Sequence, residues 1–385
     1  MVGKKKLLIL IKNIDGGTGT FLFQLLKLNK DFDIIVCALE RRRYGEVYFY
    51  KDILYCGDRA SSLNYYSLSF GLLIKIVQEI VWFTKVIRHQ KPDLILSIDT
   101  HCNLLSALVG KVLYRNTKVV ATLHNNITKV AERKTPSLIG ILRFIGKHAL
   151  GNVDAIVSPS NGVARDLKNF FLLKNRVKVI YYGLNSSEVK KKKSERIPNQ
   201  YKNIFNNGKV KIISIGRFEE QKDFATLIKA FRKITTELKN TQLILIGDGE
   251  NRKFHEELVK KLKIEQSVHF LGWQENVYPY LMSSGVFIMS SHYEGFGYVL
   301  IEAMACGLPI VSTDTPFGPG EVLDKGKYGI LVPIGDIDKM EKVINNILTD
   351  RVEHKKYSLL SRKRSKFYDE GKMLKQYKKL IRDLL

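Results

Sequence analysis

The sequence predicts an α/β protein with two domains, each built as a parallel sheet covered by helices on both faces. Short apolar runs bounded by turn residues, such as KLLILI (6–11) and DLILSI (93–98), alternate with segments of helical period through the first half. The same alternation restarts at KVKIISIG (209–216). Runs that are apolar throughout are typical of strands buried on both faces, as in parallel sheets between helices.

Each predicted element rests on its own pattern. In the first half, apolar runs that end in turn residues predict further strands at 33–39, 118–124 and 155–160, and a helical period predicts helices at 72–89 and 137–150. The second half repeats this scheme in the same way. There we predict helices at 223–238 and 251–263 and strands at 241–249, 267–272, 285–291 and 308–314.

The chain of 385 residues exceeds what one hydrophobic core usually supports, which favours two domains. We place the first at 1–185 and the second at 208–350. The polar, charged passage 186–207, which contains Pro198, is the predicted linker. The tail 351–385 has the pattern of a basic amphipathic helix that could pack back on the first domain. Two α/β domains joined in this way suggest a ligand cleft at the carboxyl ends of the strands.

Composition favours anionic partners. The chain has 63 Lys and Arg against 38 Asp and Glu, a formal net charge of +25, which suits nucleotide, phospholipid or nucleic acid. The four cysteines lack a C-x-x-C spacing, so neither a disulfide framework nor a zinc site is indicated and a reducing cytoplasm fits best. The apolar run near the start of the chain is too short for a signal peptide, and Asp15 is among the residues that end it. Lys75 and Glu79 interrupt the segment 68–87, which most resembles a membrane span.

Two basic residues follow the first strand of the second half. Arg217 and Lys222 stand in SIGRFEEQKDF, between a strand and a helix. Arg offers a planar fork to phosphate oxygens and Lys a compact charge, so both could neutralise a diphosphate, although a solvated basic turn would look the same. The glycine turn at 247–250 lacks the full G-x-G-x-x-G of a dinucleotide fold and is equally consistent with a tight turn.

The stretch EGFGYVLIEAMACG (294–307) combines a glycine loop with the start of a helix. Gly295 and Gly297 let the backbone approach a ligand and present N–H groups to it. Glu294 precedes the helix and Glu302 lies within it. Because a carboxylate can accept two hydroxyl hydrogen bonds, one glutamate could hold sugar hydroxyls and the other ribose hydroxyls, while amides and basic residues hold phosphates.

At this point the second half resembles the retaining glycosyltransferases of family 4, which have the GT-B fold. The E-x7-E motif matches Glu294 through Glu302, and GRFEEQKDF, LILIGDGE, VHFLGW and YGILVPIGD follow in the family's order over about 209–336. The resemblance implies that Arg217 and Lys222 bind the donor diphosphate, Glu302 the ribose and Glu294 the transferred sugar. It further implies donor contacts from Gly295, Phe296, Gly297, Val299 and Leu300, and a nucleobase beside Gly272 and Trp273, where Trp273 could equally be a core residue.

The resemblance also extends weakly to the first half. Gly16 and Gly17, after the first strand, match a glycine loop near the donor phosphate, and His124 matches a cleft histidine that contacts the donor sugar, so we count it with Glu294 as catalytic. Asp99 and His101 have no third metal ligand nearby and would line the cleft or cap a helix. No D-x-D motif stands where a metal-dependent transferase would need it, so we expect metal-independent transfer without a cofactor.

The sequence therefore predicts a retaining transferase that moves a hexosyl or N-acetylhexosaminyl group from a nucleotide-diphosphate sugar to a glycan or lipid-linked acceptor. The resemblance to the family favours a UDP-sugar as the donor. The predicted role is in cell-surface polysaccharide or glycolipid synthesis. We expect a cytoplasmic protein without a specific nucleic-acid partner. The helix at 136–150, with Arg143 and Lys147, could face an anionic membrane or simply pack in the domain. The alternatives are a nucleotide-sugar epimerase, a sugar phosphorylase or a polyanion-binding protein. The loop 315–323 differs from the glycine-rich form that is commoner in the family, so the sequence does not predict which sugar is selected.

Overall fold

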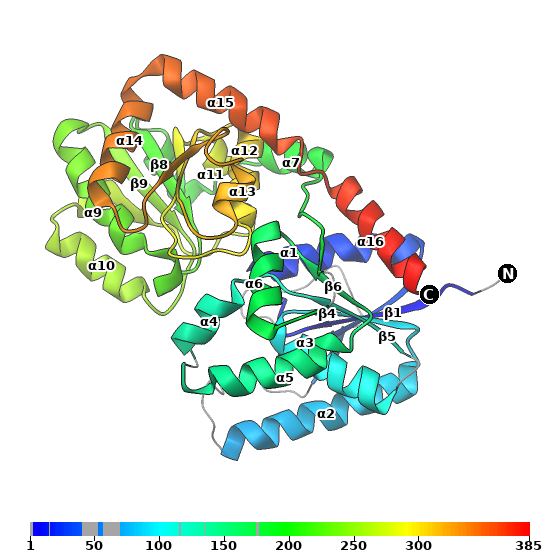
Figure 1. Ribbon diagram of the computed structural model, residues 1–385. Coiled ribbons are helices and arrows are strands. Elements are labelled where there is room, and N and C mark those ends of the chain that lie inside the picture. Colours follow the sequence, from blue (N-terminus) through cyan, green and yellow to red (C-terminus); the bar gives the residue numbers. More distant parts are fainter. Residues whose placement is uncertain are drawn as a thin grey trace. The chain divides into compact units, whose positions relative to one another are not determined.

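The computed structural model describes residues 3–14, 16–40, 53–56, 70–114, 117–134, 136–174 and 177–385. Asp15 and residues 68–69 of the membrane-like segment lie outside them. The chain divides into two compact units, residues 1–182 with 370–385 and residues 183–369. Each unit is a parallel, Rossmann-like α/β fold, so the predicted fold class is confirmed (Figure 1). Among the described helices, none is long and apolar enough to cross a membrane.

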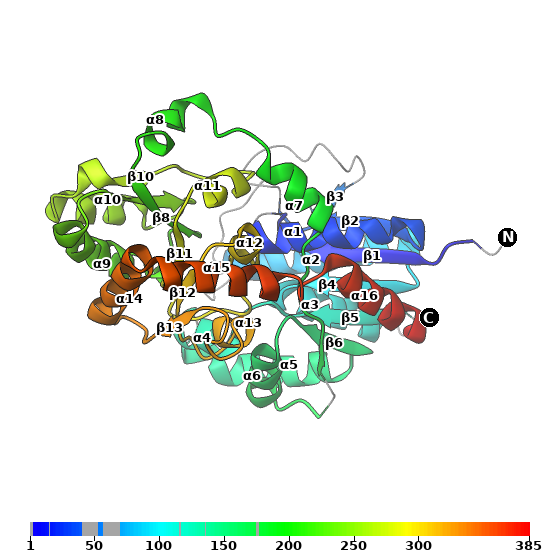
Figure 2. The same cartoon turned by 90° about the horizontal axis from the view of Figure 1, so that it is seen from above.

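The first unit contains a sheet of seven parallel strands in the order β3-β2-β1-β4-β5-β6-β7 (Figure 2). The order reverses between β1 and β4, which makes their carboxyl ends the topological switch point. The strands are β1 (Lys6–Ile11), β2 (Asp33–Ala38), β3 (Ile53–Tyr55), β4 (Leu94–Ile98), β5 (Lys118–Thr122), β6 (Ala155–Ser158) and β7 (Val177–Val179).

Helices cover both faces of this sheet. Figure 1 shows α1 and α16 on one face and α2, α3 and α5 on the other. The helices are α1 (Gly16–Leu25), η1 (Leu26–Lys30), α2 (Phe70–Gln90), α3 (Thr100–Ala107), η2 (Leu108–Leu113), α4 (Ile127–Lys134), η3 (Pro136–Leu138), α5 (Ile139–Gly151), α6 (Asn161–Phe171) and α16 (Glu370–Leu384).

The second unit contains six parallel strands in the order β10-β9-β8-β11-β12-β13, with the order reversing between β8 and β11. Its strands are β8 (Val210–Ile215), β9 (Thr241–Ile246), β10 (Val268–Phe270), β11 (Val286–Met289), β12 (Ile310–Thr313) and β13 (Ile330–Val332). Its helices are α7 (Ser186–Lys193), η4 (Asn199–Tyr201), α8 (Lys202–Phe205), η5 (Glu220–Lys222), α9 (Phe224–Glu237), α10 (Arg252–Lys261), η6 (Glu265–Ser267), α11 (Tyr278–Met282), α12 (Tyr298–Cys306), α13 (Pro319–Val322), α14 (Ile337–Thr349) and α15 (Arg351–Ser365).

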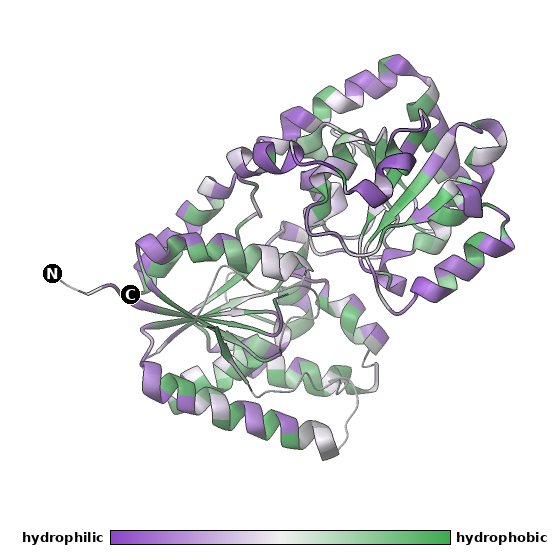
Figure 3. Cartoon of the chain, turned by 180° about the vertical axis from the view of Figure 1, so that it is seen from behind, coloured by the Kyte–Doolittle hydropathy of each residue, from purple (hydrophilic) through white to green (hydrophobic). Residues whose placement is uncertain are grey.

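Each unit has its own hydrophobic core. Leu8, Leu10 and Ile95 of the first sheet are fully buried, as are Ile212, Leu243 and Ile288 of the second. Figure 3 shows the hydrophobic strands inside both units and mixed hydrophilic and hydrophobic residues along the helices. The continuous apolar runs of the sequence therefore form strands buried on both faces.

Two segments differ from the sequence prediction in detail. The passage predicted as a linker, 186–207, contains α7, η4 and α8 and belongs to the second unit. Asn185 explains the start of α7, because its side chain caps the amides of Ser187 and Glu188. The tail forms two helices, of which α15 belongs to the second unit and α16 to the first.

Specific contacts hold α16 on the first unit beside α1 and η1. Lys27 Nζ lies 2.7 Å from Glu370 Oε1, and Lys378 Nζ lies 2.5 Å from Asp31 Oδ1. The centroids of the Tyr377 and Phe21 rings lie 5.5 Å apart. Both Tyr377 and Phe21 are buried, so the apolar face of the amphipathic tail completes the core of the first unit.

Candidate active site

The glycine loop of the second unit leads from β11 into α12. Gly297 is the N-cap of α12 and has a φ of +88°, a left-handed conformation that side chains rarely adopt. A Cβ at this position would lie 2.9 Å from Leu300 Cδ1. Among the described residues no side chain caps the helix, and Leu300 N donates to Gly297 O at 2.9 Å. The start of the helix is therefore suited to bind an anion through its other backbone N–H groups and the helix dipole. Val299 and Leu300 lie in this first turn.

Glu294 is 5% exposed and stands just before this helix. Its Oε1 accepts hydrogen bonds from Lys222 Nζ at 2.5 Å and from Ser291 Oγ at 2.7 Å. Lys222 ends η5, which follows β8, and Glu294 follows β11. The two residues therefore lie after adjacent strands at the switch point. Lys222, predicted to bind the diphosphate, and Glu294, predicted to bind the sugar, thus form one partly buried ion pair.

Polar contacts fix the two segments that carry this pair. Ser290 Oγ donates to the carbonyl oxygen of Lys222 at 2.8 Å. Gln221 Nε2 donates to the carbonyl oxygen of Tyr293 at 2.9 Å, and His292 N donates to that of Gln221 at 2.8 Å. Sequence reasoning missed these positioning residues, although Gln221 does stand beside Lys222. Lys222 and Ser291 also line a narrow pocket at the carboxyl ends of β8 and β11.

Arg217 is oriented differently from Lys222. Its side chain is 67% exposed and its Nη1 lies 3.0 Å from Glu219 Oε1. Lys222 is 19% exposed by side chain. The structure therefore brings Lys222, but not Arg217, into contact with Glu294. Arg217 stays a prediction as a phosphate ligand, at the carboxyl end of β8.

Glu302 lies within α12. Burial raises the pKa of its carboxyl group to about 7, and the charge of Lys192 and the hydroxyl of Tyr278 oppose part of this rise. The carboxyl group is therefore shared between its protonated and charged forms near neutral pH. It can donate as well as accept a hydrogen bond, which suits a vicinal pair of hydroxyls.

The glycines at the ends of β8 and β9 allow backbone segments to meet. A Cβ on Gly247, whose φ is +133°, would lie 1.9 Å from the carbonyl oxygen of Gly216. Gly247 N also donates to Gly272 O at 2.9 Å. The turn at 247–250 is therefore a packing requirement of the strand ends. Trp273, next to Gly272, is 38% exposed and is not a core residue.

In the first unit, Gly16 and Gly17 begin α1 directly after the β1 turn and are both exposed. No atom of the described residues lies within 4 Å of a Cβ built on either glycine, which leaves room there for a ligand. Gly19 is different, because a Cβ there would lie 2.4 Å from the carbonyl oxygen of Ile14. Sequence reasoning did not single out Gly19, which lets α1 pack closely against the preceding turn.

His124 follows β5 and has a partner at each ring nitrogen. Nε2 lies 2.8 Å from Thr122 Oγ1, and Nδ1 is hydrogen-bonded to the Tyr182 hydroxyl. Burial lowers the pKa of His124 to about 3, so the imidazole is neutral at physiological pH. Contact with a donor sugar, which stays a prediction, would require one of these hydrogen bonds to be shared or exchanged.

Asp99 and His101 have structural partners. Asp99 caps α3 by accepting a hydrogen bond from Cys102 N at 3.2 Å. His101 Nε2 lies 2.6 Å from Glu79 Oε2 on α2. Across the described ranges, no group of three or more His, Cys, Asp or Glu side chains could hold a metal ion.

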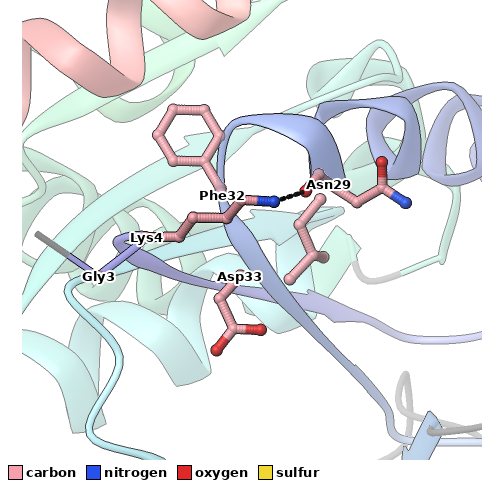
Figure 4. A pocket seen from close by; sticks show the side chains of 6 residues that line it. Gly3, Lys4, Asn29, Phe32 and Asp33 are labelled. Carbon is pink, nitrogen blue, oxygen red and sulfur yellow. Dashed lines mark hydrogen bonds between the residues drawn. The ribbon is translucent and has the colours of Figure 1, made fainter. Parts of the chain in front are cut away.

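A larger pocket of the first unit lies away from these residues (Figure 4). Lys4 Nζ donates to the carbonyl oxygen of Asn29 at its edge, at 2.9 Å. Its lining residues stand just before or at the start of β1 and β2, at the amino ends of the strands, whereas Gly16 and His124 follow carboxyl ends. The lining residues are Gly3, Lys4, Asn29, Phe32, Asp33 and Ile34.

Comparison with known proteins shows the family of the chain. Residues 195–366 match the family described as Glycosyl transferases group 1, and residues 16–188 match Glycosyltransferase Family 4. An uncharacterized glycosyltransferase of Methanocaldococcus jannaschii is 30% identical over 342 residues, which cover 80% of this chain and 83% of that protein. The chain therefore belongs to the group 1, family 4 glycosyltransferases, and it is a glycosyltransferase with the GT-B fold.

Two further similarities are informative. The chain is 27% identical over 300 residues to the N-acetylgalactosamine-N,N'-diacetylbacillosaminyl-diphospho-undecaprenol 4-alpha-N-acetylgalactosaminyltransferase of Campylobacter jejuni, covering 74% of this chain and 77% of that enzyme. The fold matches the crystal structure of Alr3699/HepE of Anabaena in complex with UDP-glucose, with a TM-score of 0.78 and 17% identity over 98% of this chain and 99% of that one.

Proposed function

We propose that this glycosyltransferase moves a hexosyl or N-acetylhexosaminyl group from a UDP-sugar to a hydroxyl of a glycan or lipid-linked acceptor, with retention of the anomeric configuration. The observation that carries the proposal is the partly buried contact of Lys222 with Glu294 just before the start of α12. The contact brings a cation from the end of η5 next to a carboxylate that precedes the amides of α12, and a sugar diphosphate calls for these groups together.

In the proposed complex, the diphosphate takes Lys222 and the amides of the first turn of α12, and Glu302 holds the ribose. Glu294 then faces the sugar, where its charge stabilises the positive charge that develops as the bond to the diphosphate breaks. The acceptor oxygen bonds to the anomeric carbon on the face from which the diphosphate leaves. Its proton passes to the departing phosphate oxygen, so no enzyme nucleophile and no metal ion are needed.

Relatives support the proposed donor and acceptor. Alr3699/HepE of Anabaena was crystallised with UDP-glucose, which supports a uridine nucleotide. The Campylobacter relative acts on a diphospho-undecaprenol-linked sugar, which supports a lipid-linked acceptor and a role in building surface glycans. Such an acceptor lies at a membrane, so peripheral membrane association forms part of the proposal.

A thermal-shift screen tests the donor. UDP and UDP-sugars should raise the unfolding temperature more than ADP or GDP, since a ligand present at 100 times its Kd stabilises the folded state by about 2.7 kcal/mol. Proton NMR of slow donor hydrolysis then tests the stereochemistry, with the α-anomer of the sugar expected first from an α-linked donor. Release of the β-anomer first, or formation of an epimerised nucleotide sugar, would contradict the proposal.

A further inference from the structure

Helix α2 exposes a row of branched apolar side chains. Ile74, Val77 and Val81 are 45%, 58% and 48% exposed. Their spacing of three and four residues places them along one face of the helix. The opposite face is anchored, because Phe83 and Ile87 are buried in the core of the first unit. The exposed row is therefore not needed to hold α2 on the sheet.

Helix α5 has a similar outer row. Ile141, Phe144 and Ile145 are 55%, 66% and 47% exposed. On the inner side, Gly146 is buried, and a Cβ there would lie 2.1 Å from Phe171 Cε1 on α6. Close packing at Gly146 fixes the rotation of α5, so the apolar row points outward.

The two rows belong to the same helical layer of the first unit (Figure 1). Helix α2 contacts η2, α5 contacts α3, and η2 directly continues α3. The chain also advances in the same direction along the sheet from β3 to β4 and from β5 to β6. Right-handed crossovers then place both connecting helices on the same face. We call the exposed apolar residues of α2 and α5 the α2–α5 surface.

The exposed charges described on α2, α3, η2 and α5 have one sign. Lys85 and Arg88 are exposed on α2, and Arg143 and Lys147 are exposed on α5. The single acid in α2, α3, η2 and α5 is Glu79, which is 2% exposed and is bound to His101. An exposed surface that combines apolar side chains with basic residues and no exposed acid is complementary to an anionic lipid surface.

We propose that the α2–α5 surface binds the interface of a bilayer that contains anionic lipids. The apolar rows enter the boundary between headgroups and acyl chains, and the four basic side chains bind lipid phosphates. A second copy of the chain fits this surface less well, because it would bring the same positive charges without an acid to pair with them. The inference rests on the membrane association included in the proposed function, but not on which donor is used, so vesicle binding and donor hydrolysis test the two proposals separately.

Vesicle co-sedimentation of the full chain tests the proposal. The protein should bind vesicles of equimolar phosphatidylglycerol and phosphatidylcholine, and bind pure phosphatidylcholine vesicles much more weakly. The variant Phe144→Ser, Ile145→Ser should bind the anionic vesicles about tenfold more weakly, and Val77→Ser, Val81→Ser should also lose affinity. Lys147→Glu should weaken binding roughly tenfold and reduce its salt dependence.

Matched controls separate this surface from general stickiness. Phe254 on α10 is 55% exposed in the second unit, so Phe254→Ser should leave vesicle binding unchanged. Since all substituted side chains are exposed, the unfolding temperatures should stay close to that of the unaltered protein. Equal binding to both kinds of vesicle, full binding by both double-serine variants, or an equal loss in Phe254→Ser would overturn the proposal. So would a concentration-dependent dimer, seen by sedimentation velocity, that Phe144→Ser, Ile145→Ser abolishes.

Discussion

Lys222 Nζ lies 2.5 Å from Glu294 Oε1, and both side chains are largely withdrawn from solvent. Each group neutralises the other where a sugar diphosphate is proposed to bind. A negatively charged donor would compete with Glu294 for Lys222, so the ion pair keeps the carboxylate and the ammonium in place until the donor arrives. Removing either partner leaves a poorly solvated charge behind.

Lys222→Met should weaken use of a UDP-sugar more than Arg217→Met does. Lys222 is the more buried cation and contacts Glu294, whereas Arg217 is 67% exposed by side chain and pairs with Glu219. We expect a loss in kcat/KM that corresponds to about 2–3 kcal/mol for Lys222→Met and about 1 kcal/mol for Arg217→Met. Steady-state donor hydrolysis measures both, with Lys229→Met on α9 as the control. Equal effects of all three substitutions would refute the role of Lys222.

The stability of the protein should depend on pH through Glu302. Its pKa is raised to about 7 in the folded protein, so between pH 4.5 and 7 the folded state holds a proton that the unfolded state has released. Stability from this group is therefore lost as the pH rises through that window. Glu302→Gln removes this pH dependence. As the pH rises from 4.5 to 8, its free energy of unfolding should rise by about 2–3 kcal/mol relative to that of the unaltered protein.

Urea unfolding at several pH values gives this difference, and Glu265→Gln, at an exposed acid, is the control. Parallel stability curves for the unaltered protein and Glu302→Gln would show that the carboxyl group of Glu302 is not desolvated.

Two neighbouring glycines should respond differently to substitution. Gly19→Ala places a Cβ against the carbonyl oxygen of Ile14 and should lower the free energy of unfolding by about 1–3 kcal/mol. Gly17→Ala meets open space and should change it by less than about 0.5 kcal/mol. Donor hydrolysis by Gly17→Ala then reports on ligand approach alone. If Gly19→Ala were as stable as the unaltered protein, α1 would not pack against this turn as described.

Donor hydrolysis should survive treatment with EDTA. In the proposed mechanism, Lys222 and the start of α12 supply the positive charge that a metal ion would otherwise provide. Rates are compared before and after chelation and after addition of Mg²⁺ or Mn²⁺, with the expected change within about twofold. Complete loss that only the added cation restores would contradict metal-independent transfer.

The sequence predicted the fold class and most elements because apolar periodicity is local information. The helix predicted at 223–238 is α9 (Phe224–Glu237), and the one predicted at 251–263 is α10 (Arg252–Lys261). The contact of Lys222 with Glu294 joins residues far apart in the sequence, and only the adjacency of β8 and β11 brings them together. Gly19 and Ile14 are close in the sequence, but the requirement for glycine arises from a backbone contact that no composition pattern reveals.

The hydrogen-bond partner of the catalytic candidate His124 also could not be predicted from the sequence. Nothing in ATLHNN indicates that Tyr182 would bind His124, because β5 and the segment after β7 meet only in the folded unit. The break between α15 and α16 was missed for a related reason. Both helices are basic, and the tertiary contacts of Glu370 and Tyr377 with the first unit set α16 apart from α15.

In the proposed mechanism, Glu294 and Glu302 have separate roles toward one nucleotide sugar. Titration calorimetry with UDP, combined with single-turnover donor hydrolysis, tests this division of roles most directly. Ribose contacts persist from the bound substrate to the transition state, whereas charge beside the sugar matters most in the transition state. Glu302→Gln should therefore weaken UDP binding about tenfold with a nearly normal rate at saturation. Glu294→Gln should bind UDP but hydrolyse the donor at least about a hundredfold more slowly. Loss of UDP affinity in Glu294→Gln as severe as in Glu302→Gln, with a normal rate at saturation, would contradict the account.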